Sequence, residues 1–183
     1  ITTTNDSITF NDATTLNAGI ALSTGAGAGT IAFNSTLDGT QTLSLTAGTG
    51  NIDFDGIVGG ATPLAAVTVV SVANLVADAA FSAASFTQTN GSGTTTFTGA
   101  VATTAIAGVS ITGTNLALNS TINTTNSGVV FTDLSGTATI AAAGVITADG
   151  AVTLDADLGI TTSADITTTN DSITFNDATT LNA

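Results

Sequence analysis

The chain has 183 residues and contains no Lys, Arg or His, and its 13 acidic residues give a formal net charge of −13 at pH 7. Proteins neutralise phosphate groups with Lys and Arg, so this composition excludes ordinary nucleic-acid binding and attachment to anionic membrane surfaces. The chain also has no Cys, which excludes a disulfide framework and thiol chemistry.

The opening segment of the chain returns unchanged at its end. The sequence ITTTNDSITFNDATTLNA occupies positions 1–18 and again positions 166–183, so the shift is 166 − 1 = 165. Self-similarity at a fixed period indicates a tandem-repeat architecture. We therefore divide the chain into one full repeat, residues 1–165, and the start of the next identical repeat, residues 166–183. The two segments are expected to occupy equivalent positions in successive repeats.

A shorter period lies inside the long one. Phe10, Phe33 and Phe54 each end an Ile-x-Phe tripeptide, with steps of 33 − 10 = 23 and 54 − 33 = 21, and Phe97 ends a related Thr-Thr-Phe tripeptide further on. These four Phe are expected to occupy equivalent inward sites. Short runs in which apolar and polar residues alternate, such as residues 42–46 (TLSLT), predict half-buried strands separated by Gly-rich turns.

Together these patterns predict an all-β fold, a β-solenoid with about eight turns of about 21 residues in each 165-residue repeat. Stacked turns would bury the inward Ile, Leu, Val and Phe and leave Thr and Asn on the outer faces. An array of β-sandwiches is the alternative, but its repeat of about 100 residues does not fit the shorter period. Residues 65–86 are apolar enough to resemble a membrane span, yet their Ser, Asn and Asp residues argue against a span and their Val-rich runs favour buried strands.

Runs throughout the chain resemble the repeats of giant bacterial surface proteins, namely the filamentous-haemagglutinin-like exoproteins and the autotransporter-like adhesins, and three of these runs serve as examples. They are residues 30–50 (TIAFNSTLDGTQTLSLTAGTG), 51–69 (NIDFDGIVGGATPLAAVTV) and 94–104 (TTTFTGAVATT). The resemblance covers nearly the whole chain. It implies a right-handed parallel β-helix, export to the cell surface or the extracellular space, and a role in adhesion or in a surface fibre.

The residue types needed for most catalysis are missing. Without His, Cys, Lys, Tyr or Glu, the chain cannot form a catalytic triad, a Schiff base or a His metal site. Pairs of Asp such as Asp53 with Asp55 could act on glycosidic bonds, but solubilisation of the surface explains them more simply. We therefore expect no enzyme activity and no cofactor.

Calcium is the one metal that this composition suits, because it binds carboxylate and amide oxygens. The candidate ligands are Asp6, Asp12, Asp155 and Asp157. The glycine-rich nonapeptide of calcium-loaded β-rolls is absent, so solvated turn residues are the preferred interpretation of these Asp.

Two functions of different class fit these observations. The first is a structural segment of a long fibre or stalk that provides length, stiffness and protease resistance, with further copies of the repeat as partners and with lateral or end-to-end self-association. The second is a binding surface, either an adhesin towards glycans or an ice-binding face built from Thr runs such as residues 2–4 and 94–96. These runs do not recur in every turn, which favours the fibre.

Overall fold

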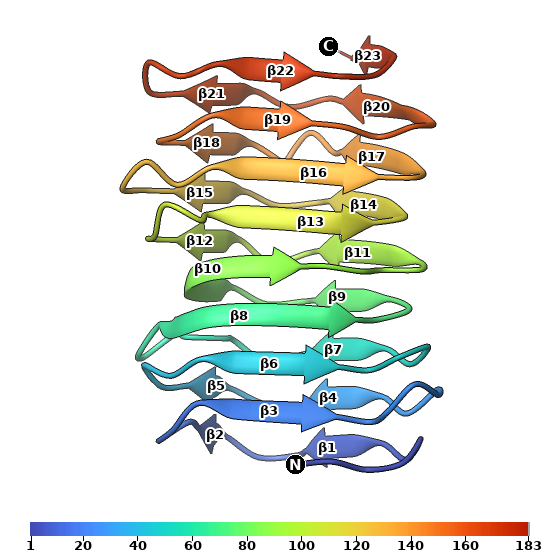
Figure 1. Ribbon diagram of the computed structural model, residues 1–183. Helices are drawn as coiled ribbons and strands as arrows, with labels where there is room; N and C mark the ends of the chain where they lie inside the picture. Colours follow the sequence, from blue (N-terminus) through green and yellow to red (C-terminus); the bar gives the residue numbers. More distant parts are fainter. Residues whose placement is uncertain (183) are drawn as a thin grey trace.

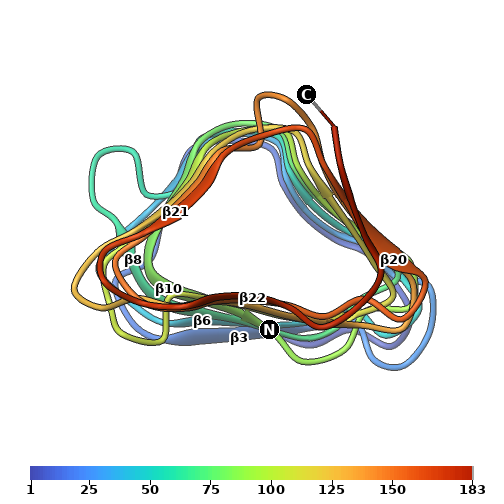
Figure 2. The ribbon, with the colours of Figure 1, turned by 90° about the horizontal axis from the view of Figure 1, so that it is seen from above.

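The computed structural model describes residues 1–182, and these residues coil into a right-handed β-solenoid with a triangular cross-section (Figures 1 and 2). Most turns contribute one short strand to each of three faces. Strands of neighbouring turns pair in parallel, and residues 1–182 contain no helix. The predicted all-β, right-handed parallel β-helix of about eight turns is therefore confirmed.

Face 1 is a continuous nine-stranded parallel sheet. Its strands are β1 (Ile8–Phe10), β4 (Ile31–Phe33), β7 (Ile52–Phe54), β9 (Leu75–Ala77), β11 (Thr94–Phe97), β14 (Asn115–Leu118), β17 (Thr137–Ile140), β20 (Gly159–Thr162) and β23 (Thr179–Leu181).

Face 2 follows face 1 along the chain. Its strands are β2 (Thr14–Thr15), β5 (Leu37–Asp38), β12 (Val101–Thr103), β15 (Ile122–Thr124), β18 (Ile146–Ala148) and β21 (Ile166–Thr168). Val58 takes the place of a strand between β5 and the next turn, because it bridges Leu37 below and Phe81 above.

Face 3 completes each turn. Its strands are β3 (Ile20–Ser23), β6 (Leu43–Thr46), β8 (Leu64–Ser71), β13 (Val109–Gly113), β16 (Val130–Leu134), β19 (Val152–Leu154) and β22 (Ile173–Phe175). The long strand β10 (Phe81–Gln88) belongs to both faces, because its first half pairs with β12 and its second half with β13. Through β10, face 3 and the later strands of face 2 form one twelve-stranded sheet, whereas β2 and β5 of face 2 form a separate two-stranded sheet.

The turns of the solenoid differ from one another mainly at the corners between the faces. Between faces 2 and 3, residues 59–63 form a loop that projects from the triangle (teal in Figure 2). Asp38 holds this loop, since its Oδ1 accepts the backbone N–H groups of Ala61 and Thr62. Outer Asn residues also join neighbouring turns, as where Asn34 donates its side-chain amide to Asn11 Oδ1 at 2.9 Å.

The core contains the Phe column that the short period predicts. Phe10, Phe33 and Phe54 stand in register on face 1, and Phe97 occupies the same column two turns further on. Phe33, Phe54 and Phe97 are at most 2% exposed, and Phe10 lies half-buried in the first turn. The prediction of four equivalent inward sites is confirmed. Parallel pairing produces such columns because equivalent residues lie directly above one another, about 4.8 Å apart.

A single small residue interrupts this column. Ala77 lies between Phe54 and Phe97, where a ring would otherwise stand. Phe81 and Phe86, both from β10 of the same turn, fill the space with edge-to-face contacts to Phe54 (5.6 Å between centroids) and to Phe97 (5.4 Å). The volume that Ala77 leaves empty is thus supplied from the other two faces, which keeps the core closely packed.

The turns differ in length, and their lengths decide on which face of the solenoid each new repeat begins, which we call the phase of the repeat. Register partners in successive turns of face 1 differ in residue number by as much as 31 − 8 = 23, for Ile8 and Ile31, and by as little as 179 − 160 = 19, for Ile160 and Thr179. The labels advance by 21 strands from β1 to β22. Val58 adds one further place on a face, because it stands where a strand is missing, and β10 adds another, because it covers two faces. The chain therefore passes through 21 + 1 + 1 = 23 places on successive faces. With three positions per turn, the 165-residue period spans seven turns and two thirds.

The expectation of equivalent positions for the identical segments is therefore wrong in one respect. The first Ile-Thr-Phe, Ile8–Phe10, lies on face 1, whereas the second, Ile173–Phe175, lies on face 3. The same shift applies to the other parts of the two segments, since residues 166–168 lie on face 2 and Thr2 pairs with Ser23 of face 3. The second copy is rotated about the solenoid axis by one third of a turn.

The apolar residues 65–86 belong to this coil. They form most of β8, all of β9 and the first part of β10, as the preferred interpretation of this stretch predicts. Across residues 1–182 we find no helix with the length and apolar character needed to cross a bilayer.

Candidate functional surfaces

An acidic cluster lies at the corner between faces 3 and 1 near the end of the chain. Asp155 and Asp157 follow β19, and Asp177 follows β22 in the turn above, so that carboxylate oxygens of all three lie within 4.8 Å of one another. Two of them already accept hydrogen bonds. The backbone N–H of Ala156 donates to Asp177 Oδ2 at 2.7 Å, and the side-chain amide of Asn176 donates to Asp155 Oδ2 at 3.0 Å.

The structure changes the set of calcium candidates. It brings Asp155 and Asp157 together as their spacing suggests, but it places Asp6 and Asp12 at different exposed corners of the first turn, outside any group of three acidic residues in the described chain. The third member of the cluster, Asp177, is the copy of Asp12 in the second identical segment. Asp177 could have been predicted from the sequence by combining the 165-residue period with the stacking of one turn on the next. The cluster alone does not establish a metal site, so the interpretation of these Asp as solvated turn residues stays a prediction.

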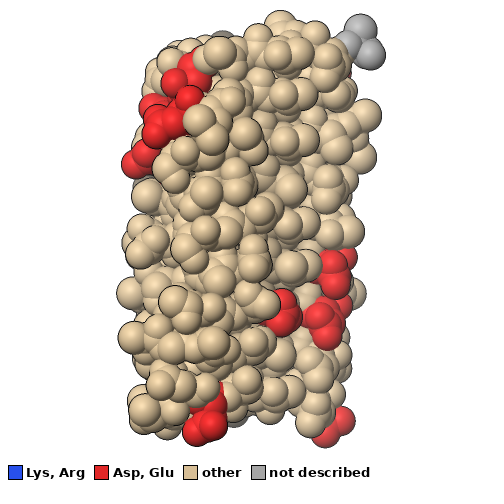
Figure 3. Space-filling view, turned by 90° about the vertical axis from the view of Figure 1, so that its right-hand side faces the viewer, with Lys and Arg blue, Asp and Glu red and all other residues tan. Residues whose placement is uncertain are grey.

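A second acidic group lies on face 1 and the corner that follows it. Asp53 points outward from β7, Asp55 follows it in the same turn, and Asp78 occupies the turn above. Partial burial raises the pKa of the Asp53 carboxyl above its ordinary value, and the negative charges of Asp55 and Asp78 raise it further. Figure 3 shows how such carboxylates gather in separate patches on an otherwise uncharged surface.

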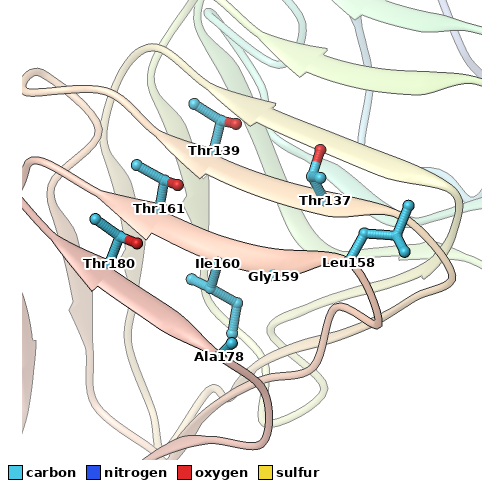
Figure 4. A pocket seen from close by; sticks show the side chains of 8 residues that line it. All are labelled: Thr137, Thr139, Leu158, Gly159, Ile160, Thr161, Ala178 and Thr180. Atoms are coloured by element: carbon cyan, nitrogen blue, oxygen red, sulfur yellow. The ribbon is translucent and has the colours of Figure 1, made fainter.

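A shallow groove on face 1 is lined by Thr hydroxyl groups and by apolar side chains. Thr139, Thr161 and Thr180 stand in register on β17, β20 and β23 and project from the sheet in one row (Figure 4). Thr137 and Leu158 complete the wall of the groove. Ile160 and Ala178 also line the groove, so it offers hydroxyl donors and acceptors beside apolar side chains, and it carries no charge that could pair with an ionic ligand.

The Thr row is too short to form an extended binding array. Below Thr139 the column continues as Ala117, and the Thr run at residues 94–96 adds only Thr96 to it. The central residue of that run, Thr95, points inward, where its hydroxyl donates to the buried Gln88 Oε1 at 2.8 Å. The predicted Thr ranks therefore do not build a flat Thr face along the solenoid.

The last described turn continues the inward columns of the turns below it. On the last turn, Ile173, Phe175 and Leu181 are 38%, 36% and 72% exposed, although the interior turns bury the corresponding positions of their columns.

Comparisons with protein-family models, with curated proteins and with solved structures found no significant match to this chain. The geometry of its surfaces is therefore the basis for the function proposed below.

Proposed function

We propose that this chain is a structural segment of a long β-solenoid fibre or stalk at the cell surface or in the extracellular space. Its role is to provide length, stiffness and resistance to proteases. Further copies of the same repeat continue the fibre, and it acts through no catalytic step, because the side chains that catalysis commonly uses are missing from the sequence.

One observation carries this proposal. Residues 166–181, which begin a second copy of the repeat, form a complete turn on top of the preceding one. Their strands use the same parallel ladders as the interior turns, with the inward Ile173 above Val152 and Phe175 above Leu154. The start of one repeat thus acts as the next turn of the repeat before it. A solenoid whose end accepts its own beginning extends without a linker.

The composition supports a location outside the cell. The chain offers trypsin-like proteases no cleavage site, because it has neither Lys nor Arg, and its backbone polar groups are tied into parallel ladders. A surface fibre needs both properties. The short Thr row on face 1 provides much less support for the alternative, an adhesive or ice-binding face.

Chains with one, two and three tandem 165-residue repeats would test the fibre. Each added repeat should lengthen a straight rod by about 37 Å, which is seven and two-thirds turns at about 4.8 Å per turn. Small-angle X-ray scattering would measure the maximum dimension and the radius of the cross-section, and the latter should stay constant. Growth as flexibly linked beads, or a cross-section that thickens with copy number, would contradict the proposal.

The location needs its own measurement. Antibodies raised against one repeat should label intact cells of the producing organism. Labelling that appears only after the cells are permeabilised would contradict a surface role and leave the rod geometry unaffected.

A further inference from the structure

The sequence contains several Asn-x-Ser/Thr tripeptides, the pattern that accepts an N-linked glycan. Within residues 1–165 this pattern begins at Asn5, Asn34, Asn90, Asn119 and Asn123. The side-chain amide of the Asn receives the sugar, and the hydroxyl two residues later belongs to the pattern that a transferase recognises. A folded acceptor therefore needs both side chains exposed and free of other partners.

Two of the five tripeptides have a side chain engaged by the neighbouring turn. Asn34 donates its side-chain amide to Asn11 Oδ1 at 2.9 Å, so the acceptor nitrogen itself is held. In the tripeptide that begins at Asn5, the hydroxyl of Ser7 accepts the backbone N–H of Thr30 at 3.1 Å. Neither tripeptide offers a transferase both of the groups that it needs.

Pairing between turns constrains two further tripeptides. Asn123 lies in the middle of β15, and the hydroxyl of Thr125, two residues later, donates to a backbone carbonyl of the turn below at 3.4 Å. In the tripeptide that begins at Asn90, the central Gly91 is buried and forms a bridge with Val72 of the turn below. A transferase would have to pull both tripeptides out of the stack before it could bend them into its active site.

Asn119 differs from the other four Asn residues. It begins the short bend between β14 and β15, at the corner between faces 1 and 2, and both Asn119 and Thr121 are exposed there. Within residues 1–182, only backbone groups hold these two residues. Asn119 donates its N–H to the carbonyl of Phe97 at 2.9 Å, and the carbonyl of Thr121 accepts the N–H of Val101 at 2.8 Å. The side-chain amide and the hydroxyl are both left for a ligand.

The surroundings of Asn119 leave room for an attached group. Its neighbours at this corner are Thr98 in the turn below and Ala141 in the turn above, because the residues that precede them are register partners. Both side chains are shorter than that of Asn, and neither is charged. Since the ladders fix the backbone at both ends of the bend, a group on the Asn119 side chain would project from the corner without displacing a strand.

We propose that Asn119 is a glycosylation site and takes an N-linked glycan from a phosphate-activated sugar. The Asn119 Nδ2 forms a bond to the anomeric carbon of the sugar, and the bond from that carbon to the phosphate oxygen breaks, with its electron pair leaving on the phosphate. The amide nitrogen gives one proton to a base of the transferase. The inference rests on the proposed function in one point, since a protein meets such a transferase on its way to the cell surface.

A glycan at this position would complement the charges of the same corner. Asp55 and Asp78 occupy the corner in the third and fourth turns, whereas Thr98, Asn119 and Ala141 leave it uncharged in the next three turns. A glycan is bulky and solubilising. On Asn119 it would therefore cover the part of the corner where carboxylates do not provide hydration.

Mass spectrometry of the protein isolated from its own organism would test the site. Because the chain has no Lys or Arg, the peptides would be generated with a protease that cleaves after apolar residues. The peptide with Asn119 should carry the glycan, at a higher occupancy than the other four tripeptides. Addition of single sugars would indicate a nucleotide-linked donor, and one preassembled oligosaccharide a lipid-linked donor. An unmodified Asn119, or an occupancy no higher than at Asn34 or Asn123, would overturn the proposal.

Two substitutions of Thr121 separate recognition of the tripeptide from an effect on folding. Thr121→Ser keeps the hydroxyl and should retain the glycan, whereas Thr121→Val keeps the shape of the side chain without the hydroxyl and should lose it. Both variants should leave the circular dichroism spectrum and the melting curve unchanged, because this side chain is exposed. Retention of the glycan in Thr121→Val would also overturn the proposal. A bare Asn119 on a protein that antibodies label on intact cells would reject the glycan alone and leave the surface role standing.

Discussion

The rings of Phe33 and Phe54 stack face to face across one turn of the solenoid, with their centroids 5.4 Å apart and their planes 7° from parallel. Phe33 stands in the same relation to Phe10, at 4.8 Å and 5°. The column thus links three successive turns through one kind of contact, and it is the most regular part of the core.

Truncation of one ring in this column should be costly but local. Phe54→Ala is expected to lower the free energy of unfolding by about 3–5 kcal/mol, because it removes a fully buried ring and leaves a cavity. Hydrogen exchange should speed up mainly in the turns of β4, β7 and β9, since contacts in a solenoid are between nearest neighbours. Phe131→Ala, at a partly exposed ring on the outside of β16, is the control and should cost roughly 1 kcal/mol or less. Loss of protection along the whole chain would contradict this local picture.

Two Thr residues in one inward column of face 2 should respond oppositely to the same substitution. Thr103 and Thr124 are register partners in β12 and β15 and are almost fully buried. The Thr124 hydroxyl donates to the carbonyl of Gly128, whereas the Thr103 hydroxyl has no hydrogen-bond partner among residues 1–182. Thr103→Val should therefore stabilise the chain by about 1 kcal/mol, and Thr124→Val should destabilise it by about 1–3 kcal/mol. Chemical denaturation measures both, and equal effects would show that the two hydroxyl environments are alike.

Stability should rise as the pH falls from 7 towards 4. Partial burial and the charges of Asp55 and Asp78 raise the pKa of Asp53. The folded chain therefore holds this proton to a higher pH than the unfolded chain does. The resulting penalty is complete above the raised pKa and vanishes below the ordinary Asp pKa of about 3.9.

Asp53→Asn should remove that penalty. At pH 7 it should raise the free energy of unfolding by no more than about 1 kcal/mol, because solvent screens a half-exposed group, and near pH 4 the variant and the parent should converge. Asp133→Asn, at an exposed outward position on β16, controls for the loss of one negative charge. A gain at pH 7 of the same size in both variants would assign the effect to net charge rather than to the Asp53 cluster.

Chelation of divalent cations should leave the melting curve unchanged. The carboxylates of Asp155 and Asp177 already accept hydrogen bonds from protein groups, and solvent reaches Asp157. Differential scanning calorimetry in EDTA and then in millimolar calcium would test this. A rise in melting temperature with calcium that disappears in Asp157→Asn would show instead that the cluster binds the cation.

The sequence predicts the architecture well because repetition in a solenoid is visible residue by residue. The Ile-x-Phe tripeptides identify the inward positions of face 1, and their steps give the approximate number of turns. The phase of the repeat could not be predicted in this way. It depends on the unequal lengths of the turns and on single irregular positions, such as Val58, which replaces a strand, and β10, which passes through a corner without a break.

The sequence predicts the candidate surfaces only in part, for a related reason. Spacing along the chain brings Asp155 and Asp157 together, but their third neighbour comes from the turn above and becomes visible only when the register is known. Similarly, the run of three Thr at residues 94–96 looks like an outer rank in the sequence. Strand alternation sends Thr95 into the core, where Gln88 satisfies its hydroxyl.

The loop at residues 59–63 is the most prominent projection from the triangular coil. If successive repeats differ in phase by one third of a turn, this loop appears at a different corner of the fibre in each repeat and regains its first direction after three repeats, about 110 Å along the axis. Neighbouring fibres could then not pack flush along any one side over a longer distance. In an array of identical repeats, the loops at residues 59–63 would thus keep neighbouring fibres apart on all three sides. Averaged over its length, the fibre would have three sides of the same chemical composition.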